Sequence, residues 1–134
     1  MALNDFSPQI NAREVKLREL CLNAVVQAGK QSIARGDLQS KISATDAEIK
    51  SVIRLLVDEE LVTVLGHNLL ATEIVNGCRE SLLKLFHGTT VVGLPAFREA
   101  TGLSRNLATL VLEFFDSGGL TRRVAEGRVL ARSN

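Results

Sequence analysis

Apolar residues recur at helical spacing along most of the chain, and short apolar runs interrupt that pattern at two places. The first periodic stretch covers residues 13–28 and ends at Gly29, a residue type that commonly terminates helices. A brief helix is expected over residues 37–42. Thr45 can cap the following helix, because Glu48 lies three residues further on and completes a capping box. The pattern therefore predicts three successive helices.

Two strands are expected after these helices. Residues 61–65 and 69–72 are rich in aliphatic side chains and flank the glycine-containing loop 66–68, as in a hairpin. Ile33 is a candidate start for one further short strand. Three helices followed by a hairpin are typical of a winged helix, a helix-turn-helix module that ends in a small β wing.

The second half of the chain repeats this order. A helix is expected over residues 73–86, and residues 89–92 form a β-branched strand candidate. Pro95 lies where a first helical turn tolerates proline, and the short helix that it opens ends at Gly102. Ser104 caps the next helix, and two consecutive glycines end that helix before the final strand pair.

The two halves align without a gap at a shift of about 59 positions, whereas their first helices align at about 57. At the larger shift, helix caps coincide and core positions coincide: Leu38 with Phe97, Thr45 with Ser104, Ile49 with Ala108, Val52 with Val111, Ile53 with Leu112, Leu56 with Phe115, Leu61 with Leu120, and Leu65 with Val124. We therefore predict a mainly α protein with small β wings, built as two tandem winged-helix domains. The predicted domains are residues 1–73, with a disordered leader over about 1–10, and residues 74–134.

Charge is distributed unevenly between these halves. Residues 1–73 carry 8 Lys+Arg and 10 Asp+Glu, a net charge of −2. Residues 74–134 carry 8 Lys+Arg and 5 Asp+Glu, a net charge of +3. A polyanionic partner is therefore expected to bind the second half.

The second copy has arginines and one asparagine at positions where the first copy has acidic, apolar or small residues. Arg105 and Asn106 start the long helix where the first copy has an aspartate and an alanine. Arg122, Arg123 and Arg128 occupy strand positions that are threonine, valine and leucine in the first copy. Because core positions are shared and these positions are not, we expect function to depend on the differences.

The start of the long helix is suited to a phosphate group, because unpaired backbone N–H groups and the helix dipole favour an anion there. Ser104 and Arg105 stand beside these groups, and an arginine can bind two phosphate oxygens at once. Contacts to bases would come from Asn106 or from loop bases that enter a pocket. In the alternative interpretation the arginines are solvated or pair with nearby carboxylates, namely Glu113, Asp116 and Glu126.

Catalysis and metal binding find little support in the sequence. Cys21 and Cys78 lie on apolar helical faces and are expected to be buried reduced thiols. Neither His67 nor His87 has neighbours arranged for catalysis or metal binding. No catalytic residue, metal or cofactor is expected. The chain also lacks a signal-peptide pattern and an apolar run of roughly 20 residues, so we expect a cytoplasmic location and no membrane partner.

Four segments of the second copy form a distinctive series: Phe97-Arg98, then Thr101-Gly102-Leu103-Ser104-Arg105, then Leu112-Glu113-Phe114-Phe115-Asp116, then Gly119-Leu120-Thr121-Arg122-Arg123. This series resembles the last winged-helix domain of bacterial selenocysteine-specific elongation factors. The stretch from Leu61 to Leu83 is also similar to the penultimate domain and its connecting helix. The resemblance therefore covers most of the chain and is strongest after Phe97.

The resemblance implies binding of the mRNA hairpin that recodes UGA as selenocysteine, with the ribosome as an additional candidate partner and a monomeric chain. Carried over residue by residue, it places these side chains near the RNA: Arg98, Ser104, Arg105, Arg122, Arg123 and Arg128. Asn106 stands where the family commonly has lysine, so one phosphate contact would be lost or replaced by a hydrogen bond. Ala125-Glu126-Gly127 also departs from the family's Gly-Asp-x wing tip, which alters the wing contacts.

In that family the winged helices follow a GTP-binding body, and this chain contains no G-x-x-x-x-G-K-[ST] phosphate loop. We therefore interpret the chain as a C-terminal fragment of such a factor rather than as a GTPase. Two other functions stay open: a DNA-binding winged-helix regulator and a protein-interaction module. A DNA regulator would read base edges with its long helix, and here Leu107 to Phe115 offers few side chains for that purpose.

Overall fold

The computed structural model describes residues 12–131, so the expected leader over residues 1–10 lies outside the described part. The first module contains α2 (Ala12–Ala28), a 3-10 turn (Gly29–Gln31), β1 (Ile33–Ala34), α3 (Arg35–Lys41), α4 (Asp46–Asp58), β2 (Val62–Leu65) and β3 (Asn68–Ala71). The second module contains α5 (Thr72–Gly88), α6 (Leu94–Thr101), α7 (Arg105–Ser117), β4 (Thr121–Val124) and β5 (Gly127–Leu130). The predicted order of helices and hairpins is confirmed in both modules.

The internal repeat is visible in the element boundaries. Helices α4 and α7 both have 13 residues and begin 59 positions apart, at residues 46 and 105. Both hairpins obey the same shift, since β2 and β4 begin at residues 62 and 121. In the first helices, the buried residues Cys21 and Val25 correspond to Cys78 and Leu82 at a shift of 57. The predicted alignment therefore describes the fold as well as the sequence.

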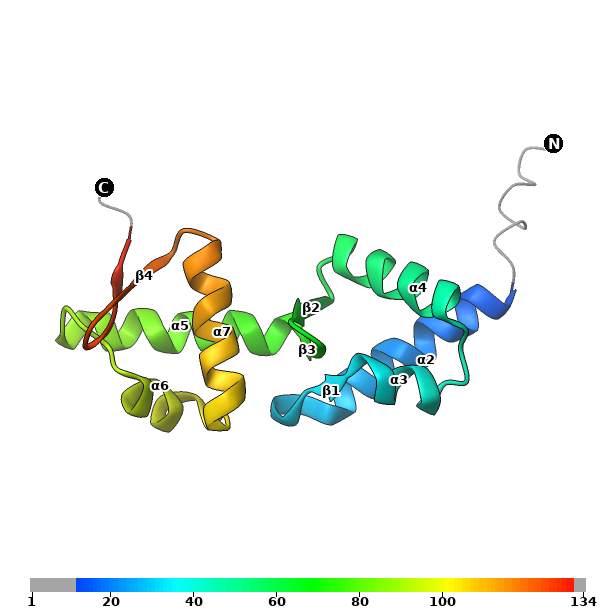
Figure 1. The fold of residues 1–134 in the computed structure, drawn as a ribbon, viewed down its shortest axis with the longest axis horizontal. Coiled ribbons are helices and arrows are strands. Elements are labelled where there is room, and N and C mark those ends of the chain that lie inside the picture. The colour runs from blue at the N-terminus through cyan, green and yellow to red at the C-terminus, as the bar shows by residue number, and fades with distance from the viewer. Residues whose placement is uncertain (1–11, 132–134) are drawn as a thin grey trace.

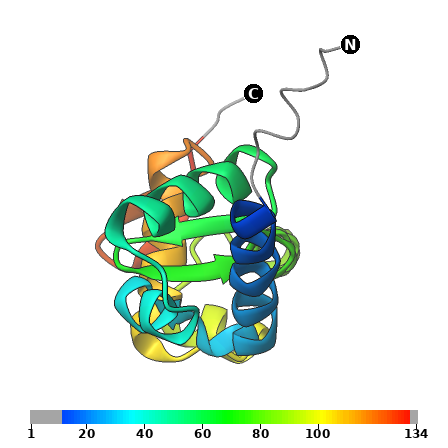
Figure 2. The same ribbon diagram turned by 90° about the vertical axis from the view of Figure 1, so that its right-hand side faces the viewer.

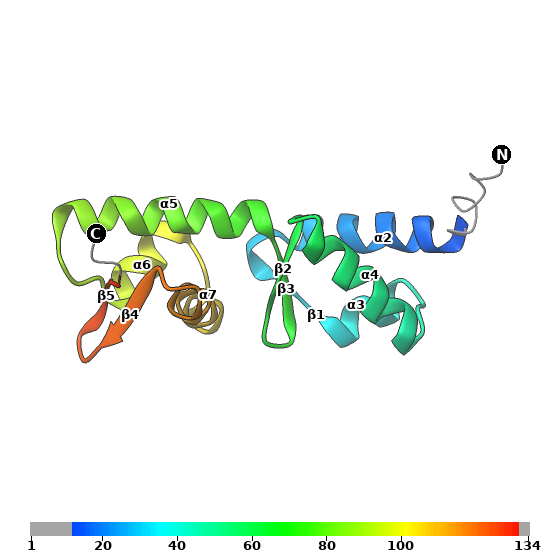
Figure 3. The same cartoon turned by 90° about the horizontal axis from the view of Figure 1, so that it is seen from above.

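The two modules lie end to end in an elongated molecule (Figure 1). Helix α5 runs along the second module and connects it to the β2–β3 hairpin of the first. Seen from above, α2 and α5 lie along one side of the molecule, and α4, α7 and both hairpins lie on the other (Figure 3). Viewed from the end of the first module, α2, α3 and α4 surround its strands (Figure 2).

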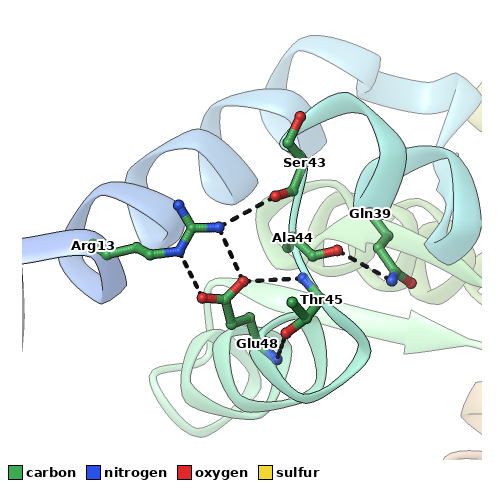
Figure 4. Close-up of polar contacts among 6 residues, drawn as sticks. All are labelled: Arg13, Gln39, Ser43, Ala44, Thr45 and Glu48. Atoms are coloured by element: carbon green, nitrogen blue, oxygen red, sulfur yellow. Dashed lines mark hydrogen bonds and ion pairs between the residues drawn. The ribbon is translucent and has the colours of Figure 1, made fainter.

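The start of α4 is held by a polar network (Figure 4). The Thr45 hydroxyl accepts a hydrogen bond from the Glu48 backbone N–H, and the Glu48 carboxylate accepts one from the Thr45 N–H, which completes the predicted capping box. The Arg13 guanidinium of α2 donates to the same carboxylate at 2.6 Å and 3.1 Å. This pairing lowers the pKa of Glu48 to about 2, chiefly through the Arg13 hydrogen bond and the backbone hydrogen bond from Thr45.

Each module has its own apolar core, but the packing crosses between them. Along α4 the buried stripe is Ile49, Val52, Ile53 and Leu56, and along α7 it is Leu107, Ala108, Val111, Leu112 and Phe115. In the β2–β3 hairpin, Val62 and Leu69 pack into the first core. Leu65 and Leu70 of the same hairpin pack into the second core, although they precede α5 in the chain. The apolar packing therefore continues across the predicted domain boundary near Glu73.

Two expectations required revision. The strand candidate over residues 89–92 is reduced to one bridge, in which Val92 exchanges two backbone hydrogen bonds of 2.9 Å with Arg128. Gly127 permits this close approach of the two backbones, because an added Cβ there would lie 2.3 Å from the Val92 carbonyl oxygen. The second expectation concerns α2, where Val15 and Leu20 follow the helical spacing of the apolar residues. Their side chains are 48% and 39% exposed and do not belong to the buried core.

Both cysteines are buried and unpaired, as predicted. Burial raises the pKa of the Cys21 thiol to about 11. Burial also raises the pKa of Cys78, and the charge of Lys30 opposes this effect. The protonated, inaccessible thiols behave as small apolar core groups.

The Glu48 network predicts loss of stability in acid. Because the folded-state pKa of Glu48 is depressed from 4.5 to about 2, its contribution is present above pH 4.5 and is lost as the pH falls toward 2. Urea unfolding at neutral pH and at about pH 3 should therefore show a smaller pH-dependent loss for Glu48→Gln than for the unaltered chain. Glu19→Gln, an exposed α2 substitution, is the control. Equal losses in all three proteins would contradict the role given to Glu48.

The hairpin packing predicts a large effect of truncating Leu70, which is fully buried in the second core. Leu70→Ala should lower the free energy of unfolding by about 2–5 kcal/mol in urea titrations. Leu55→Ala, on the 39% exposed position of α4, should change it by less than about 1 kcal/mol. A Leu70→Ala effect as small as the Leu55→Ala effect would show that the hairpin does not join the cores.

Candidate nucleic-acid interface

The turn before α7 gathers four of the predicted site residues. Gly102 ends α6 in the left-handed conformation, with φ of 77°, which turns the chain sharply into Ser104. The Ser104 hydroxyl caps α7 by accepting a hydrogen bond of 3.2 Å from the Leu107 N–H. Arg98 reaches the same turn, where its Nε donates to the Leu103 carbonyl oxygen at 3.4 Å. We name Arg98, Ser104, Arg105 and Asn106 the helix-start cluster.

The helix-start cluster is available to a ligand. All four of its residues are exposed. Within residues 12–131, neither Arg98 nor Arg105 forms an ion pair with a carboxylate. The first turn of α7 contains no acidic residue, so the positive end of the helix dipole is not neutralised there. Two guanidinium groups and free backbone N–H groups thus surround one helix N-terminus, an arrangement that favours a phosphate group.

Arg122 and Arg123 lie in β4 at the other end of α7, and both are exposed. Adjacent residues of a strand point to opposite faces, so these two side chains do not form one cluster. Arg123 shares a face with its cross-strand partner Arg128, which packs toward α7, and Arg122 lies on the opposite face. The predicted Arg-Arg pair therefore offers one cation on the α7 side of the wing and one on its far side.

Arg128 is a buried, paired residue and not an exposed cation. It is only 7% exposed, and its Nη2 and Nε donate to one Asp116 oxygen at 2.9 Å and 3.2 Å. Thr121 also donates to Asp116, at 2.6 Å. The alternative interpretation of the arginines, pairing with carboxylates, is thus correct for Arg128.

The Asp116 carboxylate joins the end of α7 to both wing strands. Burial acts to raise the pKa of Asp116, but hydrogen bonds from Arg128 and Thr121 and the charges of Arg128 and Arg123 together lower it below its usual value. The carboxylate therefore stays ionised and holds the wing against the helix. Sequence inspection gave Asp116 as one of three carboxylates that could pair with the arginines, but it did not identify which pair forms, because the pairing joins positions 12 residues apart on different elements.

The two groups of cations are separated along α7. Asp116, which anchors the wing, follows Arg105 by 11 residues in one helix, a rise of about 16 Å. The structure thus brings Arg98, Ser104, Arg105 and Asn106 together and places Arg123 and Arg122 near the opposite helix end. A ligand that contacts both groups must extend along α7, as a nucleic-acid strand does and a single small anion does not.

Other classes of site gain no support from the described residues. In residues 12–131, no group of three or more His, Cys, Asp and Glu side chains gathers as metal ligands would. Within the same range, no helix has the length and hydrophobicity that crossing a membrane requires.

Comparisons with known proteins agree with this architecture. Residues 86–130 match the family described as elongation factor SelB, winged helix. The mRNA-binding domain of elongation factor SelB from E. coli, solved in complex with SECIS RNA, superposes with a TM-score of 0.77 at 17% identity, covering 91% of this chain and 99% of that one. A bacterial selenocysteine-specific elongation factor EF-Sec superposes with a TM-score of 0.63 at 17% identity, covering 94% of this chain and 19% of that chain. No curated protein matches by sequence comparison.

These matches confirm the predicted fold class. The structural likeness to the E. coli domain extends over both modules, and the family match lies within the second. The family match also includes the helix-start cluster, both wing strands and Asp116.

The Asp116 network predicts that Asp116→Asn destabilises the protein, because it leaves the Arg128 guanidinium buried without a counter-charge. We expect a loss of about 2–3 kcal/mol in urea unfolding, less than the ~3–5 kcal/mol of a fully buried pair because the Asp116 side chain is 23% exposed. Glu113→Gln, which alters an exposed carboxylate of the same helix, should be close to neutral. If both substitutions changed the free energy of unfolding by similarly small amounts, Asp116 would have no structural role.

Proposed function

We propose that this chain, whose residues 86–130 match the winged helix of elongation factor SelB, binds an RNA hairpin through α7 and the β4–β5 wing. The observation that carries the proposal is the exposed, carboxylate-free helix-start cluster at the N-terminus of α7. The match to the winged-helix family favours RNA over other polyanions. The likeness to a domain solved with SECIS RNA supports the same choice.

The helix-start cluster would hold the RNA backbone. Arg98 and Arg105 can each bind two oxygens of one phosphate, and the free N–H groups of α7 add neutral donors beside them. Asn106 is exposed next to these groups and carries both a donor and an acceptor, so it is the residue suited to a base edge. Backbone contacts would position the hairpin, and Asn106 would contribute to its recognition.

The wing would supply the second contact. Arg123 lies on the α7 side of the hairpin and is held there because Asp116 anchors Arg128 and Thr121 to the helix. A strand that extends about 16 Å from the helix-start cluster along α7 reaches this end of the helix. Arg122 faces away and is expected to contribute less.

In the cell, the proposed ligand is the mRNA hairpin that directs selenocysteine insertion at UGA, and the proposed parent is a selenocysteine-specific elongation factor. The chain spans 19% of the EF-Sec chain with which it superposes. The GTP-dependent step would belong to another part of the parent protein, since this chain carries no phosphate-loop motif. The ribosome stays an additional candidate partner.

A DNA-binding regulator is less well supported. The side chains exposed along the middle and end of α7 are few, Glu113, Phe114 and Ser117, and include none of the Arg, Lys, Asn or Gln residues that most often read base edges in a major groove. The cations instead lie at the helix start and on the wing, where they would contact backbone phosphates.

Replacement of single arginines tests the proposal. Arg105→Ala and Arg123→Ala should each weaken binding of the hairpin and reduce the slope of log K against log salt by about 0.7–0.9. Arg122→Ala should have a smaller effect because it lies on the other face of the wing. Lys84→Ala, an exposed cation of α5, is the matched control and should leave the slope unchanged. Filter binding or fluorescence anisotropy over a salt series provides the measurement.

The choice of RNA needs a separate comparison. A selenocysteine-insertion hairpin should bind more tightly than a DNA duplex of the same length at the same salt concentration. Equal affinities for the two ligands would contradict RNA recognition, and equal effects of Lys84→Ala and Arg105→Ala would contradict the proposed surface.

A further inference from the structure

The first module carries cations of its own, at positions that are not cationic in the second. They are Arg35, Lys50 and Arg54, and the imidazole of His67 lies in the same module; a shift of 59 aligns these four with Leu94, Thr109, Glu113 and Glu126. In the opposite direction, the cations Arg98, Arg105, Arg122 and Arg123 align with Gln39, Asp46, Thr63 and Val64. The two modules therefore use the same fold to present positive charge on different surfaces. The overall negative charge of the first half conceals this arrangement.

These cations line one groove between α4 and the β2–β3 hairpin. The groove has a volume of about 650 Å³ and is lined by Arg35, Lys50, Arg54 and His67 together with seven uncharged residues. Ile53, Val57 and Leu69 contribute apolar surface to it. None of its eleven lining residues is acidic. We name it the α4 groove.

The cations of the α4 groove are free to bind a ligand. Lys50 and Arg54 are four residues apart on α4 and therefore lie on one face of the helix, and both are exposed. Within residues 12–131, neither of them nor Arg35 pairs with a carboxylate.

Two of the three acidic residues of α4 have polar partners outside the groove. Asp46 accepts a hydrogen bond of 2.8 Å from the Gln39 amide. Glu48 pairs with Arg13. Asp46 also lines a neighbouring depression together with Arg35 and Lys50 and partly offsets their charge, but no carboxylate lines the α4 groove itself.

Both walls of the α4 groove are held in place. The Arg35 N–H donates to the His67 carbonyl oxygen at 2.8 Å, which joins the start of α3 to the hairpin turn. The hairpin is further held because Leu65 and Leu70 pack in the core of the second module. A preorganised groove requires little ordering when a ligand binds.

We infer that the α4 groove binds the phosphate backbone of an RNA duplex, separate from the hairpin that is proposed for the second module. Arg and Lys side chains from α3 and α4 that form no ion pair suit a ligand with repeated negative charge. An A-form RNA duplex keeps its base edges in a deep and narrow major groove, so the contact is expected to be independent of sequence. A separate RNA is favoured because the β2–β3 hairpin, which forms one wall of the groove, lies between α4 and α7 (Figure 3).

The experiment measures the affinity of the full chain for two RNAs. The first probe is a blunt RNA duplex of arbitrary sequence, and the second is the selenocysteine-insertion hairpin. The double variant Lys50→Ala/Arg54→Ala should weaken duplex binding by roughly tenfold or more and reduce its salt slope by about 0.7–0.9 for each lost phosphate contact. Hairpin affinity should stay unchanged. The control double variant Lys16→Ala/Lys84→Ala removes equal charge from α2 and α5 and should alter neither.

The reciprocal variant keeps this inference distinct from the function proposed for the second module. Arg105→Ala/Arg123→Ala should weaken hairpin binding and leave duplex binding unchanged. If neither double variant lost hairpin binding, the function proposed for the second module would be contradicted. The duplex measurements would then test the α4 groove independently.

Three results would overturn the inference. They are duplex binding that is unaffected by Lys50→Ala/Arg54→Ala, stoichiometric competition between duplex and hairpin for one site, and tighter binding of poly-glutamate than of duplex RNA at the groove. Because all substituted residues are exposed, circular dichroism and urea midpoints of every variant should match those of the unaltered chain.

Discussion

Burial of the β2–β3 hairpin on both of its faces is the constraint on which the arrangement of the molecule depends. A wing normally has one face toward its own module and one toward solvent or ligand. Here Val62 and Leu69 pack into the first core, whereas Leu65 and Leu70 pack into the second. Exposing either pair to water would lose the free energy of burying that apolar surface in one of the cores. The modules are therefore held at a defined orientation. This packing withdraws one face of the first wing from ligand binding and leaves the second wing free.

The second wing is held by polar contacts where the first is held by apolar ones. Asp116, Thr121 and Arg128 occupy the positions of Val57, Val62 and Leu69 in the repeat. A buried ion pair is often no more stable than the apolar residues that could replace it. Its geometry is more specific, since Arg128 and Thr121 donate to defined oxygens of Asp116. The network therefore fits a wing that must present Arg123 at a fixed distance from the helix-start cluster.

Duplication followed by divergence of surfaces accounts for the distribution of charge. The shared positions are the apolar stripes of α4 and α7 and the caps Thr45 and Ser104. Most of the cations that differ between the modules are exposed, so they could change without disturbing either core, whereas the buried Arg128 required Asp116 as its partner. Cations at the start of α7 and on its wing favour the RNA hairpin proposed for the second module, and cations along α4 favour the duplex proposed for the first.

Local patterns in the sequence determined the elements, because helical periodicity, caps and turn glycines act within a few residues. The capping box at Thr45, the end of α6 at Gly102 and the repeat at a shift of 59 were all predictable in this way. Exposure of each arginine was decided only by tertiary structure. Arg128 resembled Arg122 and Arg123 along the chain, but the fold placed an aspartate from another element against it and buried it. The α4 groove likewise required α3, α4 and the hairpin to meet, since no short stretch of sequence contains its cations.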